Sequence, residues 1–164
     1  DSKDMKIIME DIVLRDLVAD VCVDMKIFAD SKGVELEIKE LEDFRLKGDE
    51  LKLRRMLWNI LENGIKYTQN GGKIEIISYI NNGFVCIDIK DDGVGIPEED
   101  IKYIFDRFYR GDKSRKRASG SGLGLSISKW IAEAHQGTIE VKSAPAQGSL
   151  FTIKLPVISG GKQA

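Results

Sequence analysis

Three polar side chains recur at helical spacing, at Asn59, Asn63 and Lys66. Steps of four and then three residues place them on one face of a predicted helix. Amide oxygens suit Mg²⁺, which usually keeps several waters and bridges to the phosphates of a substrate, and an ammonium group can contact a phosphate. The stripe therefore predicts a site for a metal ion and a phosphate. The alternative is an ordinary solvated helix face.

A second candidate is the segment 91–97 (DDGVGIP), which follows a predicted strand. A carboxylate at a strand end, beside glycines, can accept a hydrogen bond from an exocyclic amine while the backbone closes over a flat ring. Adenine offers that donor, whereas guanine presents an oxygen at the same edge and would leave a buried polar group unpaired, at about 1–3 kcal/mol. Asp91 is thus a candidate for adenine recognition. The alternative is a β-turn that uses Asp and Gly for their turn propensities.

The third candidate is the segment 120–125 (GSGLGL), which opens another predicted helix. Glycines allow close approach, and a helix N-terminus attracts anions through its free N–H groups. The segment is neither a P-loop nor a dinucleotide-binding turn, because no Lys-Ser/Thr pair follows it and no strand precedes it directly.

Before it, residues 105–117 hold six basic residues. This run is either a solvated loop or a mobile lid whose cations meet a triphosphate.

Composition restricts the classes of protein that these candidates can serve. The chain has 164 residues, 42% of them hydrophobic and 32% charged, and a net charge of −2, which suits one globular domain without general affinity for nucleic acid. A single histidine excludes a multi-histidine metal site. Apolar runs are too short for a membrane span or signal peptide. Cys22 and Cys86 are expected to be buried free thiols of a reducing compartment rather than a disulfide.

The elements that must position the candidates follow from periodicity. Gly33 should end the first helix, Asp49 should cap the second, and Asn81-Asn82-Gly83 indicates a tight hairpin. Strands joined by short turns predict a two-layer α/β sandwich, with a mixed, mostly antiparallel sheet and three long helices on one face. Strands 34–38 and 44–46 should form a hairpin of their own. The predicted helices are 17–29, 50–68 and 123–135, and the predicted strands are 34–38, 44–46, 73–80, 84–90, 138–143 and 149–155.

In this order, the motifs resemble the ATP-binding catalytic domain of bacterial sensor histidine kinases, within the superfamily that includes gyrase, Hsp90 and MutL. The segment NILENGIKYT resembles the N box of that family, DDGVGIP and GSGLGLSI its two glycine boxes, and FDRFYR its F box. The match runs from about residue 10 to 156. Departures are Gly64 where Ala is commoner, Ser149 in place of Thr, and Gln136 in place of Gly.

The resemblance implies a Bergerat-type ATP-binding fold and a role for each matching residue. Asn63 would coordinate Mg²⁺ with help from Asn59, and Asp91 would bind the adenine amino group. Lys66 and Tyr67 would contact the phosphates and the nucleotide, while Arg110 and Arg107 would face the γ-phosphate. Thr152 would support Asp91 through a water molecule. The remaining residues expected to line the ATP site are Gly93, Gly95, Ile96, Gly120, Gly122, Leu123 and Gly124.

The resemblance also implies a reaction and its partners. The γ-phosphoryl of Mg·ATP would pass to a histidine on a helical dimerisation domain of the same protein, and then to a response regulator. His135 stands where the family carries a structural histidine, so the acceptor is expected elsewhere. We expect residues 1–10 to end the preceding helix, 11–157 to form the catalytic domain, and 158–164 to be a flexible tail. A cytoplasmic location is expected, in a parent protein that is either membrane-anchored or soluble.

Two other functions compete with this interpretation. A gyrase-like or repair ATPase would need a glutamate base where Asn59 stands, and an amide cannot take a proton from water. Glu62 faces another side of the helix and is a poor substitute. A degenerate module that only docks partners is the second alternative, although the retention of Asn63, Asp91 and the glycines argues against it.

Overall fold

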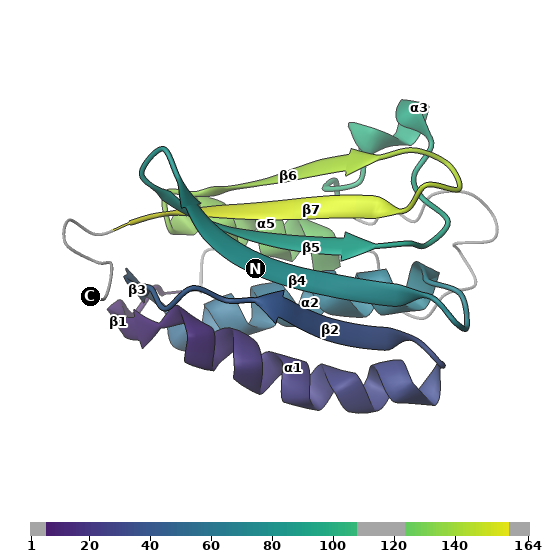
Figure 1. Ribbon diagram of the computed structural model, residues 1–164. Coiled ribbons are helices and arrows are strands. Elements are labelled where there is room, and N and C mark those ends of the chain that lie inside the picture. The colour runs from purple at the N-terminus through teal and green to yellow at the C-terminus, as the bar shows by residue number, and fades with distance from the viewer. Residues whose placement is uncertain (1–5, 108–123, 158–164) are drawn as a thin grey trace.

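The computed structural model describes residues 6–107 and 124–157, in which three long helices cover one face of a five-stranded sheet (Figure 1). The strand order is β2-β4-β5-β7-β6, parallel between β2 and β4 and antiparallel elsewhere, which confirms the predicted fold class. The elements are β1 (Glu10–Val13), α1 (Leu14–Ser31), β2 (Glu35–Glu40), β3 (Arg45–Gly48), α2 (Glu50–Tyr67), β4 (Lys73–Asn81), β5 (Phe84–Asp91), α3 (Glu98–Ile101), α5 (Gly124–Ala134), β6 (Thr138–Ser143) and β7 (Ser149–Pro156).

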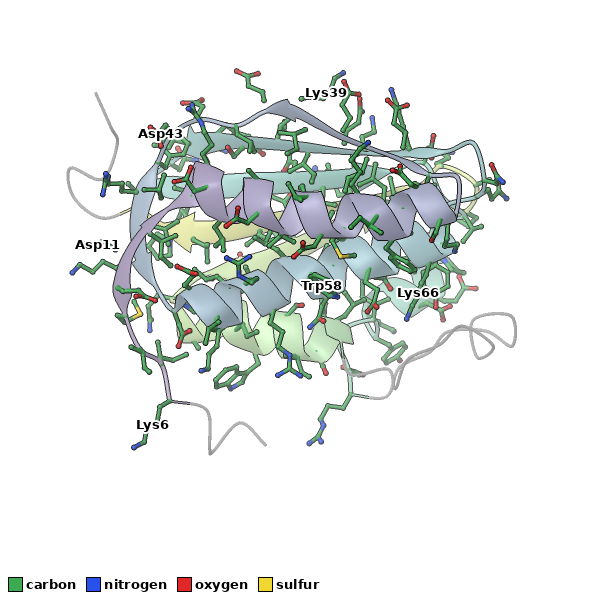
Figure 2. The ribbon with its side chains drawn as sticks, turned by 90° about the horizontal axis from the view of Figure 1, so that it is seen from below. Lys6, Asp11, Lys39, Asp43, Trp58 and Lys66 are labelled. Atoms are coloured by element: carbon green, nitrogen blue, oxygen red, sulfur yellow. The ribbon has the colours of Figure 1, made fainter. Side chains whose placement is uncertain are left out.

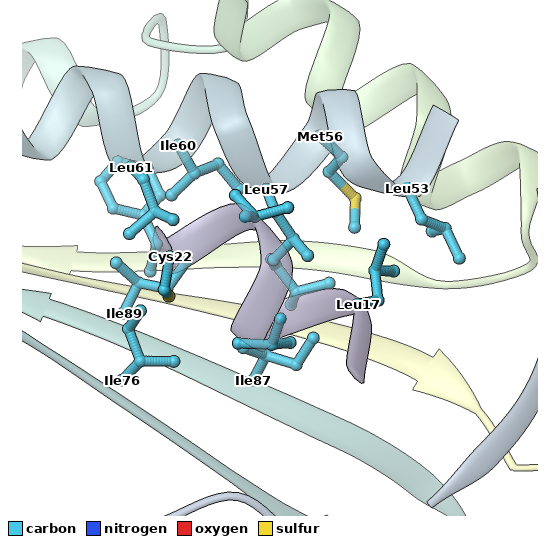
Figure 3. Packing of buried hydrophobic residues seen from close by; sticks show 14 of the residues in the cluster. Leu17, Cys22, Leu53, Met56, Leu57, Ile60, Leu61, Ile76, Ile87 and Ile89 are labelled. Carbon is cyan, nitrogen blue, oxygen red and sulfur yellow. The ribbon is translucent and has the colours of Figure 1, made fainter. Parts of the chain in front are cut away.

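The core lies between the helices and the inner face of the sheet. Apolar residues at helical spacing on α1 and α2 meet alternate residues of β4 and β5, as Figure 3 shows for Leu57, Ile76 and Ile87. Each such side chain contributes roughly 1.5–3 kcal/mol when fully buried. Cys22 belongs to this core, where burial raises the pKa of its thiol to about 12. Both cysteines are buried free thiols, as predicted.

The predicted start of α2 and the predicted hairpin are confirmed. Asp49 caps α2 by accepting a hydrogen bond of 3.1 Å from the Lys52 N–H. Between β4 and β5, Asn81 pairs with Phe84, and the two loop residues Asn82 and Gly83 have φ angles of 52° and 82°. Such positive φ values at both loop residues are those of a tight two-residue hairpin turn.

The structure differs from the sequence prediction in three respects within the first third of the chain. Strands β2 and β3 do not pair with each other, because β2 pairs with β4 and β3 pairs antiparallel with β1. Phe44 lies between the two strands in sequence and is fully buried, so the chain there packs into the core instead of forming a tight turn. Of the residues 1–10 expected to end a preceding helix, 6–9 are not helical and Glu10 begins β1, while residues 1–5 and the expected tail 158–164 lie outside the described residues. Helix α1 also begins three residues earlier than predicted, at Leu14.

Within residues 6–107 and 124–157, no helix combines the length and apolar character needed to cross a membrane.

Candidate functional site

The polar stripe of α2 is present as predicted. Asn59, Asn63 and Lys66 are each half-buried on the helix, while the neighbouring Ile60 and Ile65 are fully buried against the core. The Asn59 amide Nδ2 donates a hydrogen bond of 3.2 Å to the Gly124 carbonyl at the start of α5. Since the amide nitrogen donates that bond, the Asn59 amide oxygen takes no part in it. The donor set of the stripe, two amides and an ammonium group, therefore fits a hard cation beside a phosphate.

Asp91 ends β5 and is almost completely buried, with 5% of its surface exposed. Its Oδ1 accepts a hydrogen bond of 2.9 Å from the Gly93 N–H, which fixes the orientation of the carboxylate. Its Oδ2 lies 3.7 Å from the point where a Cβ on Gly64 would stand. Since Gly64 follows Asn63 on α2, the buried carboxylate and the polar stripe meet at the same part of that helix.

The loop after β5 is held between the end of α2 and the turn that joins β6 to β7. The Val94 N–H donates to the Tyr67 carbonyl at 3.1 Å, and the Ile96 N–H donates to Ser143 Oγ at 2.8 Å. A Cβ on Gly93 would overlap the Tyr67 carbonyl. Gly95, with φ of +75°, would meet the carbonyl of Ala144 in the same way. Close backbone approach therefore explains both glycines.

The structure places most of the predicted residues together. Three segments contribute: α2, the loop after β5, and the start of α5. The predicted residues that they carry are Asn59, Asn63, Lys66, Tyr67, Asp91, Gly93, Gly95, Ile96 and Gly124. Arg110, Gly120, Gly122 and Leu123 lie outside the described residues, so their predicted roles stay predictions.

The F box begins within the described part of the chain. Phe105 packs edge to face on Phe151 of β7, with ring centroids 6.4 Å apart and the ring planes at 89°. The Lys129 ammonium of α5 lies 5.4 Å from the centre of the Phe105 ring. Phe105 thus joins the sheet to α5, and the exposed Arg107 follows it at the end of the first described range.

Thr152 does not lie with the other site residues, and its predicted role beside Asp91 is wrong. In the register of β5 and β7, Thr152 pairs with Asp88, and its Oγ1 donates to Asp88 Oδ1 at 2.7 Å. Asp88 and Asp91 are three residues apart in one strand, so their side chains emerge from opposite faces of the sheet. Thr152 therefore shares the outer face with Asp88.

The residue that sequence reasoning missed is Ser149. It is the register partner of Asp91, it is buried on the inner face, and its hydroxyl lies 2.8 Å from Ser143 Oγ. One signal could have found it: counting in twos along β7 from the buried Phe151 puts Ser149, and not Thr152, on the helix-covered side.

His135 is buried with 5% of its surface exposed, and both ring nitrogens are used. Nδ1 lies 2.7 Å from the Ile131 carbonyl, and Nε2 accepts from the Asp49 N–H at 2.9 Å. A carbonyl only accepts and an N–H only donates, so Nδ1 carries the proton and the ring is neutral. This arrangement agrees with the structural role expected of His135.

Known proteins share this sequence and this fold. The family model described as histidine kinase-, DNA gyrase B- and HSP90-like ATPase matches residues 48–159. The sensor-like histidine kinase SenX3 of Mycobacterium tuberculosis is 38% identical over 151 residues, which are 92% of this chain and 37% of that protein. The chain thus spans little more than a third of that relative's length.

Two solved structures are similar along nearly the whole chain. The mycobacterial sensor histidine kinase MprB has a TM-score of 0.80 at 27% identity, over 92% of this chain and 98% of that one. The catalytic domain of the histidine kinase ThkA also has a TM-score of 0.80 at 27% identity, over 96% and 100% of the two chains. From its sequence and its fold, this chain belongs to the histidine kinase-, DNA gyrase B- and HSP90-like ATPase family, and within it to the catalytic domains of sensor histidine kinases.

Proposed function

We propose that the chain binds Mg·ATP and donates its γ-phosphoryl group to a histidine on a helical dimerisation domain of the same protein. The observation that carries this proposal is the buried Asp91 carboxylate, fixed by the Gly93 N–H and facing Gly64 beside the polar stripe of α2. A buried carboxylate there can accept the adenine amino group, while Asn63 and Lys66 lie on the helix that would meet the phosphates.

The residues divide the work between binding and charge stabilisation. Phosphoryl transfer passes through a loose transition state, so the protein acts chiefly by positioning the reactants and by stabilising charge. The amides of Asn59 and Asn63 would hold Mg²⁺, which supplies charge neutralisation between the phosphates. The Lys66 ammonium would bind phosphate oxygens. Arg110, outside the described residues, would face the γ-phosphate together with Arg107.

A response regulator is the proposed final acceptor of the phosphoryl group, and the cytoplasm, where ATP is abundant, is the proposed location of the domain.

A gyrase-like hydrolase is less well supported as the function of this chain. The side chain at position 59 is an amide whose nitrogen donates to Gly124, and an amide is not a base for water. We therefore expect slow ATP hydrolysis by the chain.

The test is a nucleotide titration of Asp91→Ala, with Asp88→Ala as the matched control on the outer face of the same strand. Loss of a hydrogen bond to a buried carboxylate costs about 1.5–3 kcal/mol, so Asp91→Ala should weaken Mg·ATP binding by about tenfold or more. Asp88→Ala should bind like the parent chain. Mg·GTP should bind poorly to all three proteins. Absence of heat with Mg·ATP in the parent chain, or equal binding by Asp91→Ala, would favour a docking module instead.

A further inference from the structure

The C-terminal end of α2 carries two of the proposed ATP-binding residues, Lys66 and Tyr67. The last four carbonyls of a helix have no partner within it and must find one elsewhere. Thr68 supplies two donors: its hydroxyl donates to the Gly64 carbonyl at 2.7 Å and its N–H to the Ile65 carbonyl at 3.4 Å. The Tyr67 carbonyl accepts from the Val94 N–H at 3.1 Å.

Further contacts come from Lys32, at the end of α1 and 34 residues from Lys66 in sequence. Its half-buried ammonium lies 3.0 Å from the Lys66 carbonyl and 3.3 Å from the Ile65 carbonyl. A cation at this position also opposes the negative end of the helix dipole. The ammonium therefore closes the last turn of α2 by both hydrogen bonding and charge.

The backbone beside Lys32 keeps its side chain in reach of α2. The Gly71 N–H donates to the Gly33 carbonyl at 2.8 Å, and the Glu35 N–H donates to the Gly72 carbonyl at 2.9 Å. These bonds tie the turn that follows α1 to the loop that follows α2. Lys32 is thus part of a fixed junction and not a lysine on an open surface.

We propose that Lys32 is a positioning residue for the nucleotide site, which fixes the last turn of α2 and thereby the places of Lys66 and Tyr67. The inference rests on the proposed function, since it assigns Lys32 a part in ATP binding without contact to ATP. When the ammonium is removed, the last turn opens for part of the time. Only the closed fraction binds nucleotide, so the apparent dissociation constant is the intrinsic one divided by that fraction.

The experiment compares Lys32→Met and Lys32→Arg with Lys26→Met, a control on the same helix whose ammonium is exposed and lies 3.9 Å from Asp30. In calorimetric titration with Mg·ATP, we expect Lys32→Met to bind about fivefold more weakly, as a closed fraction of about one fifth implies. Lys32→Arg retains the cation and should bind within about twofold of the parent chain. Lys26→Met should bind like the parent chain.

Hydrogen exchange without nucleotide separates positioning from general stability. In Lys32→Met, amides of residues 65–68 should exchange faster, while those of β4 and β5 keep the parent rates. Unchanged exchange at 65–68 together with unchanged affinity overturns the proposal, and so does faster exchange spread over the whole chain. Failure of the parent chain to bind Mg·ATP is a different result: it removes the proposed function, and the positioning role with it.

Discussion

At the scale of residues, Ser149 and Thr152 of β7 lie on opposite faces of the sheet. Ser149 lies opposite Asp91 on the buried face, and Thr152 donates to Asp88 on the outer one. Because Ser149 is the register partner of Asp91 on this face, its hydroxyl can orient the same bound group, directly or through water. The outer-face hydroxyl has no such access, because the sheet separates it from the site.

We therefore expect Ser149→Ala to weaken Mg·ATP binding by about three- to tenfold, the loss of one hydrogen bond of about 0.5–1.5 kcal/mol. Thr152→Val should keep the parent affinity within about twofold, although it loses its bond to Asp88 and some stability. Titration calorimetry with Mg·ATP measures the affinity of each variant. A larger loss of affinity in Thr152→Val than in Ser149→Ala would restore the original expectation for Thr152.

Ser143 is the second hydroxyl with a defined task. Its Oγ accepts from the Ile96 N–H at 2.8 Å and donates to the Gly148 carbonyl at the same distance, so it joins the loop after β5 to the turn between β6 and β7. Ser143→Ala leaves both backbone groups without this partner. We expect the free energy of unfolding to fall by about 1–3 kcal/mol, measured by urea unfolding. Ser143→Thr retains the hydroxyl and should recover most of the loss; equal losses in both variants would contradict this assignment.

At the scale of elements, the start of α2 depends on an ionised cap. Burial alone would raise the pKa of Asp49, but hydrogen bonds from the N–H groups of Ile8 and Lys52 and from the Lys52 ammonium outweigh it. The folded-state pKa is therefore below its ordinary value of 3.8. A carboxyl whose pKa is lowered by folding stabilises the protein above the unfolded pKa, and this contribution is lost as pH falls through the folded value.

The pH dependence of unfolding should show this contribution. Asp49→Asn keeps a capping oxygen but loses the charge, so it should be less stable than the parent chain at pH 7 by about 1 kcal/mol. The difference should narrow as pH falls below 3.8, because the carboxyl takes up a proton first in the unfolded chain and, at lower pH, in the folded one. Asp24→Asn, on an exposed part of α1, is the control. A difference between Asp49→Asn and the parent that stays constant from pH 7 to pH 3 would contradict the role of the charge.

Which elements could be predicted from the sequence depends on whether their cause is local. The hairpin of β4 and β5 follows from Asn82 and Gly83, because the turn conformation needs only those two residues. The capped start and the apolar stripe of α2 are equally local. The partners of β2 and β3 are not, since a parallel pair and a pairing across α1 are set by the packing of the whole layer.

The candidate site divides in the same way. The stripe of Asn59, Asn63 and Lys66 is visible from helical spacing, and the residues of the loop after β5 follow one another in sequence. The choice between Ser149 and Thr152 needs the register of β7 against β5, which involves residues about 60 positions apart. The role of Lys32 could not be predicted from the sequence, because nothing near it in sequence indicates that its ammonium reaches the end of α2.

At the scale of the whole molecule, α2 is the helix through which the parts of the site are joined. It lies between α1 and α5 in the helical layer, and Figure 2 shows Lys66 toward its C-terminal end. Its start is bonded to the end of α5 through His135, and its end is bonded to α1 through Lys32. The helix that carries the residues proposed to hold the phosphates is thus bonded to a neighbouring helix at each end.

His135 is the only histidine of the chain, in a family whose members include protein histidine kinases, and its surroundings decide whether it can accept a phosphoryl group. Nε2 is occupied by the Asp49 N–H and Nδ1 by the Ile131 carbonyl, and the ring is buried. Attack on phosphorus requires an exposed, unprotonated ring nitrogen. Neither nitrogen meets this condition while α5 and the start of α2 stay packed together.

We therefore expect no phosphohistidine at position 135 when the chain is incubated with Mg·[γ-³²P]ATP, assayed as acid-labile label and by mass spectrometry of the peptide that contains it. His135→Ala should instead act on folding: it leaves the buried Asp49 N–H without its acceptor, and the free energy of unfolding should fall by about 2–4 kcal/mol. Acid-labile label on His135, or a melting temperature unchanged by His135→Ala, would contradict the structural role. Because both ring nitrogens are used where the end of α5 packs on the start of α2, a phosphoryl group could reach the ring only after that junction had opened.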